Sequence, residues 1–170
     1  MQPNPVHAYI GAVVERLNAD GCQPHPENWN GATVMVGRRS DFKLAWMATR
    51  MHLFTMVVAV PEITVPAIMQ FTEHATGFAK NSKGGLPRGL QTGIALFPAM
   101  VSDRVDPAAV AWAEEKQRLS FACFTRPVVV DVTYGVVGCF RRNATVGAIY
   151  NRYLRAKGDL YFPRWNPPTR

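Results

Sequence analysis

The chain has 170 residues, of which 48% are hydrophobic and 18% are charged, and its formal net charge at pH 7 is +7. This length and apolar fraction suit a single globular domain and exclude a largely disordered chain. No apolar run approaches the roughly 20 residues of a membrane-spanning helix, and the first five residues lack the basic-then-apolar layout of a signal peptide. We therefore expect a soluble, cytoplasmic protein with no membrane partner.

The first part of the chain predicts a helix followed by two strands. Apolar residues at three- and four-residue steps indicate a helix over 7–17, and a stretch rich in Pro and Asn indicates a loop over 22–31. A short strand is expected over 33–36, a turn over 37–41 and a long β-prone run over 44–60. The two strands are expected to pair as an antiparallel hairpin.

The rest of the chain predicts alternating helices and strands. In order, these are a helix over 64–80, a strand over 93–101, a helix that starts at Asp106, strands over 119–124, 127–133 and 136–140, and a helix over 146–157. The segment from 93 to 132 is long enough for a right-handed parallel crossover. The predicted class is α/β or α+β, with a mixed sheet and packed helices in one domain over 1–160 and a Pro-rich tail over 161–170.

Cysteine and histidine do not stand at the spacings of a metal site. The three cysteines, Cys22, Cys123 and Cys139, are odd in number and widely separated, which argues against a disulfide framework and against structural zinc. Free cysteine behaves as a small hydrophobic residue, so we expect these thiols to be buried and reduced. We predict no metal and no cofactor.

Positive charge is concentrated toward the carboxyl-terminal end. Residues 138–170 hold seven of the 19 Lys and Arg but one of the 12 Asp and Glu. Arg141 and Arg142 precede the last predicted helix, where a bound anion would offset the unfavourable helix dipole, and Arg152 and Arg155 share one face of that helix. Arginine with nearby aromatic residues can hold phosphate and stack on bases. We therefore predict a non-catalytic module that binds an anionic partner, either nucleic acid or an acidic protein.

A glycine-rich basic segment after the second predicted helix is another candidate anion site. Its cations, Lys80, Lys83 and Arg88, suit an anion, and its glycines let a backbone approach a ligand closely. Leu90 and Gln91, however, stand where a Walker motif needs Lys and Ser or Thr. We expect either a phosphate-contacting loop or a surface connection, not a Walker site.

The tripeptide Asp41-Phe42-Lys43 suggests a catalytic alternative. It matches the end of the PD-(D/E)xK nuclease pattern, and the predicted element order loosely resembles the core of that fold, which also begins with a helix before antiparallel strands. The resemblance implies that Asp41 helps to hold a divalent metal and that Lys43 positions water, with Glu15 as a further ligand. A metal-dependent phosphodiesterase is therefore one alternative, although an acid at a hairpin tip can instead hydrogen-bond the turn backbone.

The tail suggests a further alternative, a self-assembling structural protein. Its aromatic residues Tyr161, Phe162 and Trp165 are expected to be exposed, and its prolines would keep the arm extended. Such an arm could dock on a second copy of the chain. This hypothesis predicts a homo-oligomer formed through residues 161–170.

Overall fold

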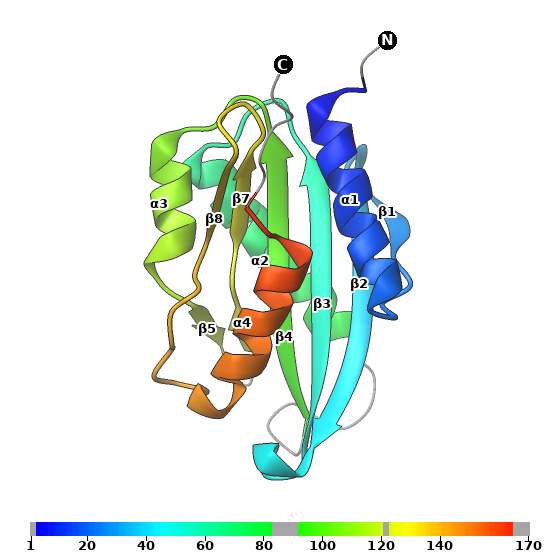
Figure 1. Ribbon diagram of the computed structural model, residues 1–170, viewed down its shortest axis with the longest axis vertical. Coiled ribbons are helices and arrows are strands. Elements are labelled where there is room, and N and C mark those ends of the chain that lie inside the picture. The colour runs from blue at the N-terminus through cyan, green and yellow to red at the C-terminus, as the bar shows by residue number, and fades with distance from the viewer. Residues whose placement is uncertain (1–2, 83–91, 121–122, 165–170) are drawn as a thin grey trace.

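The structure is a computed structural model that describes residues 3–82, 92–120 and 123–164. Within these ranges it has four α-helices and the eight strands of one mixed sheet (Figure 1). The elements are α1 (Pro5–Ala19), β1 (His25–Trp29), β2 (Ala32–Lys43), the 3-10 helix η1 (Leu44–Trp46), β3 (Thr49–Ala59), α2 (Val65–Ser82), β4 (Thr92–Ser102), α3 (Pro107–Glu115), β5 (Arg118–Ser120), β6 (Cys123–Thr125), β7 (Val128–Asp131), β8 (Val136–Cys139), the 3-10 helix η2 (Ala148–Tyr150) and α4 (Asn151–Tyr161). The predicted class, a mixed sheet with helices packed on it, is confirmed.

The long strands β3 and β4 run parallel at the centre of the sheet. On the β3 side, β2 and then β1 continue the sheet in antiparallel pairing. On the other side, β6 and β7 share one position, both parallel to β4, and β5 and β8 pair antiparallel with them. The parallel crossover expected between residues 93 and 132 is therefore present as β4, α3 and β7.

The helix starts follow from local capping. The α1 helix begins directly after Asn4, whose side chain accepts a hydrogen bond from the Val6 amide. The α3 helix begins after Asp106, whose carboxylate accepts a hydrogen bond from the Ala108 amide. Both helices have proline at their first position, where no amide hydrogen is needed. The sequence therefore predicted both starts to within two residues.

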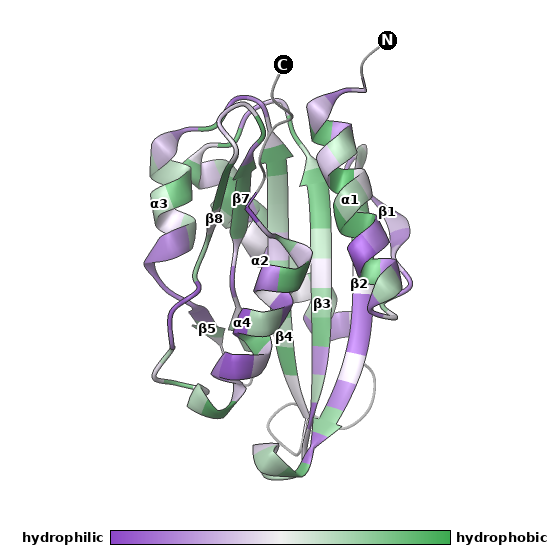
Figure 2. Cartoon of the chain, in the orientation of Figure 1, coloured by the Kyte–Doolittle hydropathy of each residue, from purple (hydrophilic) through white to green (hydrophobic). Residues whose placement is uncertain are grey.

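Apolar cores cover both faces of the sheet. On one face, α1 and α4 pack over β3 and β4, with Tyr9, Leu53 and Phe97 in the contact. On the other face, α2 and α3 pack on the same strands, with Ile68 against neighbours such as Phe54. Because β3 and β4 are covered on both sides, they are near-continuous apolar runs, which Figure 2 shows beside the hydrophilic lower half of β2.

Two expectations for the first part of the chain are wrong. The expected loop over 22–31 contains β1, which tolerates Pro26 because an edge strand has one side without ladder hydrogen bonds. The expected turn over 37–41 is strand, with Asp41 paired to Met51 across the β2–β3 ladder. The chain reverses later, over residues 44–48, so Asp41 does not lie at the hairpin tip.

The carboxyl-terminal aromatic residues also depart from the expectation. Tyr161 and Phe162 are fully buried, and their rings lie 6.4 and 6.2 Å from the ring of Phe97. They belong to the core and are not free to dock on a second copy. Trp165 lies outside the described residues, and the last helix begins at residue 151 instead of 146.

Two further expectations concerned the state of the cysteines and the absence of a membrane-spanning helix. The cysteines are buried and free, as predicted. Across the described ranges, no helix combines the length and the apolar character needed to cross a membrane.

The β2–β3 reversal contains two neighbouring residues in the left-handed region of backbone space. Met47 has a φ of 55° and Ala48 a φ of 57°. This region is disfavoured for residues with a Cβ atom by roughly 1–2 kcal/mol. The reversal is therefore strained.

We predict that Ala48→Gly raises the free energy of unfolding by about 0.5–1 kcal/mol, because the relieved strain exceeds the added flexibility of the unfolded chain. The matched control is Ala45→Gly in η1, which should lower the free energy of unfolding by about 0.5–1 kcal/mol. Urea unfolding followed by circular dichroism measures both. An equal loss of free energy of unfolding in the two variants would contradict the inferred backbone strain.

Candidate functional site

A chain of ion pairs fastens α4 to α1 and β2. Arg39 pairs with Asp41 through two hydrogen bonds of 2.7 and 2.8 Å, and its Nη1 lies 2.8 Å from Oδ1 of Asp20 at the end of α1. From α4, Lys157 Nζ donates to Asp20 Oδ2 at 2.6 Å, and the Tyr153 hydroxyl donates to Asp41. We call these five residues the Arg39 network. Its two carboxylates balance its two cations.

Hydrogen bonds within the Arg39 network, together with burial, determine the protonation states of its residues. The bidentate hydrogen bonds from Arg39 lower the pKa of Asp41. Burial raises the pKa of Asp20, but the hydrogen bond from Lys157 and the other donors around it bring the net shift below the ordinary value. Burial, together with Asp41, raises the pKa of Tyr153. At neutral pH the carboxylates are charged and the tyrosine donates its proton.

The residues of the phosphodiesterase hypothesis do not form a metal site. Both carboxylate oxygens of Asp41 are used by the Arg39 network. Lys43 Nζ lies 5.0 Å from the ring centroid of Trp46, and Glu15 is exposed on α1. Within the part of the chain that the structure describes, no three His, Cys, Asp or Glu lie close enough to hold a metal ion. The geometry gives this hypothesis no support.

Four of the carboxyl-terminal cations fall into two groups. Arg141 is paired with Asp159 at 2.5 Å, and Lys157 belongs to the Arg39 network. Arg152 and Arg155 are exposed on α4, and neither forms a salt bridge with another described residue. The second group carries positive charge that the fold leaves available.

The remaining predicted cations lie elsewhere. Arg142 donates to the backbone carbonyl of Glu115 at 2.9 Å and lies over the Phe140 ring. Lys80 lines a separate hollow of about 400 Å³ beside α2, on the opposite face of the sheet from α4. The structure therefore does not bring Lys80 to the α4 arginines. Lys83, Arg88 and the rest of the glycine-rich segment lie outside the described residues.

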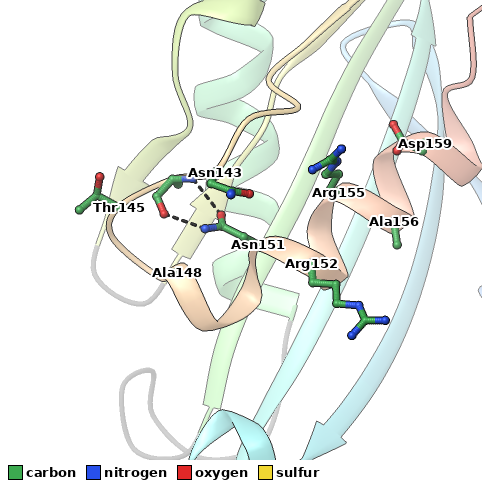
Figure 3. A pocket seen from close by; sticks show the side chains of 9 residues that line it. Asn143, Thr145, Ala148, Asn151, Arg152, Arg155, Ala156 and Asp159 are labelled. Atoms are coloured by element: carbon green, nitrogen blue, oxygen red, sulfur yellow. Dashed lines mark hydrogen bonds between the residues drawn. The ribbon is translucent and has the colours of Figure 1, made fainter.

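A hollow of about 770 Å³ lies between α4 and the loop before it, residues 143–148 (Figure 3). We call it the α4 hollow. Its polar lining comprises Asn143, Thr145, Asn151, Arg152, Arg155 and Asp159. Asn151 holds the loop in place, because its Oδ1 accepts from the Ala144 amide at 2.9 Å and its Nδ2 donates to the Ala144 carbonyl at 2.8 Å.

A buried arginine supports the floor of the α4 hollow. Arg126 is 1% exposed, and it donates from Nη2 to Asn151 Oδ1 at 3.1 Å and from Nε to Gln117 Oε1 at 2.7 Å. Its Nη1 is buried and has no hydrogen-bond partner among the described residues, none of whose carboxylates pairs with it. Burial lowers the pKa of Arg126. A buried charge without a counter-ion is costly, and Arg126 is held by these two hydrogen bonds and by the Phe140 ring, whose centroid lies 5.1 Å from its guanidinium.

Gly147 sets the shape of the loop that lines the hollow. Its φ is +73°, and a Cβ atom there would lie 2.4 Å from the ring of Phe124. Only glycine fits both the backbone conformation and the close approach. The loop therefore rests directly on β6.

Sequence reasoning identified the exposed arginines of the hollow but missed its floor. Arg152 and Arg155 were found from their helical spacing and from the local excess of positive charge. Arg126, Asn143 and Asn151 were missed. The one signal was that Arg126 stands between two β-prone runs, 119–124 and 127–133, which is an unusual place for a charge without a partner.

Comparison of the chain with family models, with curated proteins and with solved structures finds no match. Function must therefore be argued from the geometry alone.

The lowered pKa values of Asp20 and Asp41 predict a loss of stability in acid. A folded-state pKa below that of the unfolded chain stabilises the protein above the unfolded value, about 3.9, and this contribution disappears as pH falls through the folded pKa. We expect Asp41→Asn to lower the free energy of unfolding at pH 7 by about 1–3 kcal/mol and to flatten its decline in acid.

Urea unfolding between pH 7 and pH 3 measures this dependence. Asp103→Asn, at an exposed site, is the control and should follow the unmodified chain. If the free energy of unfolding fell with pH in parallel for the Asp41 variant and the unmodified chain, the lowered pKa of Asp41 would be contradicted.

Proposed function

We propose that the chain is a non-catalytic module that binds the phosphate backbone of a nucleic acid in the α4 hollow. The observation that carries the proposal is that two exposed arginines, Arg152 and Arg155, line a hollow whose floor is bonded to the buried, unpaired cation Arg126.

The charge balance around the hollow favours an anion. Its one acidic lining residue, Asp159, is already neutralised by Arg141. The segment from 141 to 157 contains no Asp or Glu. The positive charge of Arg152 and Arg155 is therefore not cancelled locally, and Arg126 adds to it from a low-dielectric site, where electrostatic interactions are stronger.

The chemistry of the lining fits phosphate oxygens. Arginine presents a planar set of donors that matches phosphate. Asn143 and Thr145 are exposed at the opposite edge of the hollow, and their amide and hydroxyl groups can donate to the same oxygens. Arg152 and Arg155 stand three residues apart on α4, with Cβ atoms about 5–6 Å apart, and their side chains extend in different directions (Figure 3), so they can contact separate phosphates.

An extended polymer suits this site better than an enclosed small molecule. Most residues that line the hollow are exposed, and Figure 3 shows the side chains of Arg152 and Arg155 extending from α4 in different directions. A backbone could therefore pass through it without a closed pocket. Sequence-independent binding of this kind is dominated by charge.

We expect fluorescence anisotropy to show binding of labelled single- or double-stranded oligonucleotides at low salt. The affinity should fall steeply with salt, because each phosphate contact releases counterions. The double variant Arg152→Ala, Arg155→Ala should bind more weakly and reduce the slope of log affinity against log salt by about 1.4–1.8.

Arg104→Ala is the matched control, since the Arg104 side chain is 71% exposed on a different part of the surface. It should leave the slope unchanged to within about half a unit. Absence of binding at low salt, or equal slopes for the double variant and the control, would contradict the proposal. Circular dichroism checks that both variants are folded.

A further inference from the structure

Large apolar side chains are exposed at the end of the sheet where β2 turns into β3. Leu44 is 80% exposed and Met47 82% exposed, and Phe42 and Ile149 beside them are each about half exposed. Ile149 joins this group because η2 lies against η1. We call these four residues the apolar tip. Exposed apolar groups of this kind mark surfaces that are covered by a partner.

The fold holds the apolar tip outward by a buried anchor. Trp46, between Leu44 and Met47, is 3% exposed, and its ring lies 5.4 Å from that of Tyr150 and 4.9 Å from that of Tyr153. Directly after this anchor, the chain takes the strained left-handed conformation at Met47. The side chains of Leu44 and Met47 are therefore displayed on a fixed turn and not on a freely moving loop.

The surroundings of the apolar tip carry positive charge. Lys43 and Arg50 flank the turn and are both exposed. Neither the segment 42–52 nor the segment 143–156 contains an Asp or Glu. The neighbouring acid, Asp41, is paired with Arg39. The end of the molecule thus combines exposed apolar side chains with cations that no local acid neutralises.

We propose that the apolar tip docks on an anionic lipid surface. Leu44 and Met47 would enter the boundary between headgroups and acyl chains, while Lys43 and Arg50 contact anionic headgroups. Charge complementarity supports this partner. The shape supports it also, because η1 protrudes beyond the other elements at that end of the sheet (Figure 1). A protruding turn can enter a fluid interface, whereas a protein partner would have to supply a matching hollow.

From the sequence we expected no membrane partner, and this proposal departs from that expectation. That expectation rested on the absence of spanning segments and of a signal peptide, and an interfacial contact needs neither. The proposal is independent of the α4 hollow, because it uses none of the residues assigned to phosphate binding.

Sedimentation with lipid vesicles tests the proposal. The full chain should bind vesicles of phosphatidylcholine that contain about a third phosphatidylserine and bind much more weakly to phosphatidylcholine alone, since the cations need anionic lipid. The double variant Leu44→Glu, Met47→Glu should lose binding by about tenfold or more. These side chains are exposed, so the variant should fold, which circular dichroism checks.

Tyr134→Glu is the matched control, because Tyr134 is equally exposed at 80% but lies after β7, at the other end of the sheet. It should bind vesicles like the unmodified chain. The double tip variant should also keep its oligonucleotide binding, so that failure of one proposal is distinguishable from failure of the other.

Three results would overturn the lipid proposal. The first is no binding to either kind of vesicle. The second is equal binding by the tip variant and the unmodified chain. The third is a dimer in light scattering that the tip variant dissociates while vesicle binding is absent, which would assign the apolar tip to a second copy of the chain.

Discussion

The paired charges of Arg39 and Asp41, continued through Asp20 to Lys157, determine where α4 lies, together with the burial of its apolar side in the core. This helix has a strongly polar outer side, and its inner side contributes Tyr153 and Lys157 to the network. Because the inner side is committed to β2 and to the end of α1, the side with Arg152 and Arg155 must face outward. The ion pairs thus help to orient a helix whose other face carries the available charge.

Whether a cation is available to a ligand depends on whether a nearby carboxylate pairs with it, and not on how many cations the segment contains. The carboxyl-terminal stretch has seven Lys and Arg, yet Arg141 and Lys157 are neutralised within the fold. Conversely, Arg126 comes from outside that stretch and reaches the floor of the α4 hollow through Asn151. The charge count of this segment therefore includes cations that are neutralised in the fold, and it leaves out Arg126. Whether a cation is available depends on which residues become its neighbours.

The sequence predicted the elements whose signals are local and missed those that depend on tertiary context. The first helix was predicted from its apolar spacing, and the start of α3 from the capping residue Asp106, whose carboxylate accepts from the Ala108 amide two residues later. Gly37 suggested a turn, but it lies in β2, paired with Thr55 of β3. Leu17 of α1 packs so closely against it that an added Cβ would come within 3.1 Å. Nothing local to Gly37 reveals that contact. For the same reason, the available arginines of α4 could be predicted from their spacing, whereas the buried Arg126 could not.

The position beside β4 is divided between two short strands, and proline explains the division. Pro98 stands within β4, and Pro127 follows β6. Neither residue has an amide hydrogen to give to a ladder, so β6 and β7 attach to β4 through separate sets of three and four paired residues. Each short strand is consequently held to β4 by a ladder of its own. Arg126 lies at the boundary between the two ladders, where its amide still donates to the Leu96 carbonyl of β4 at 2.9 Å.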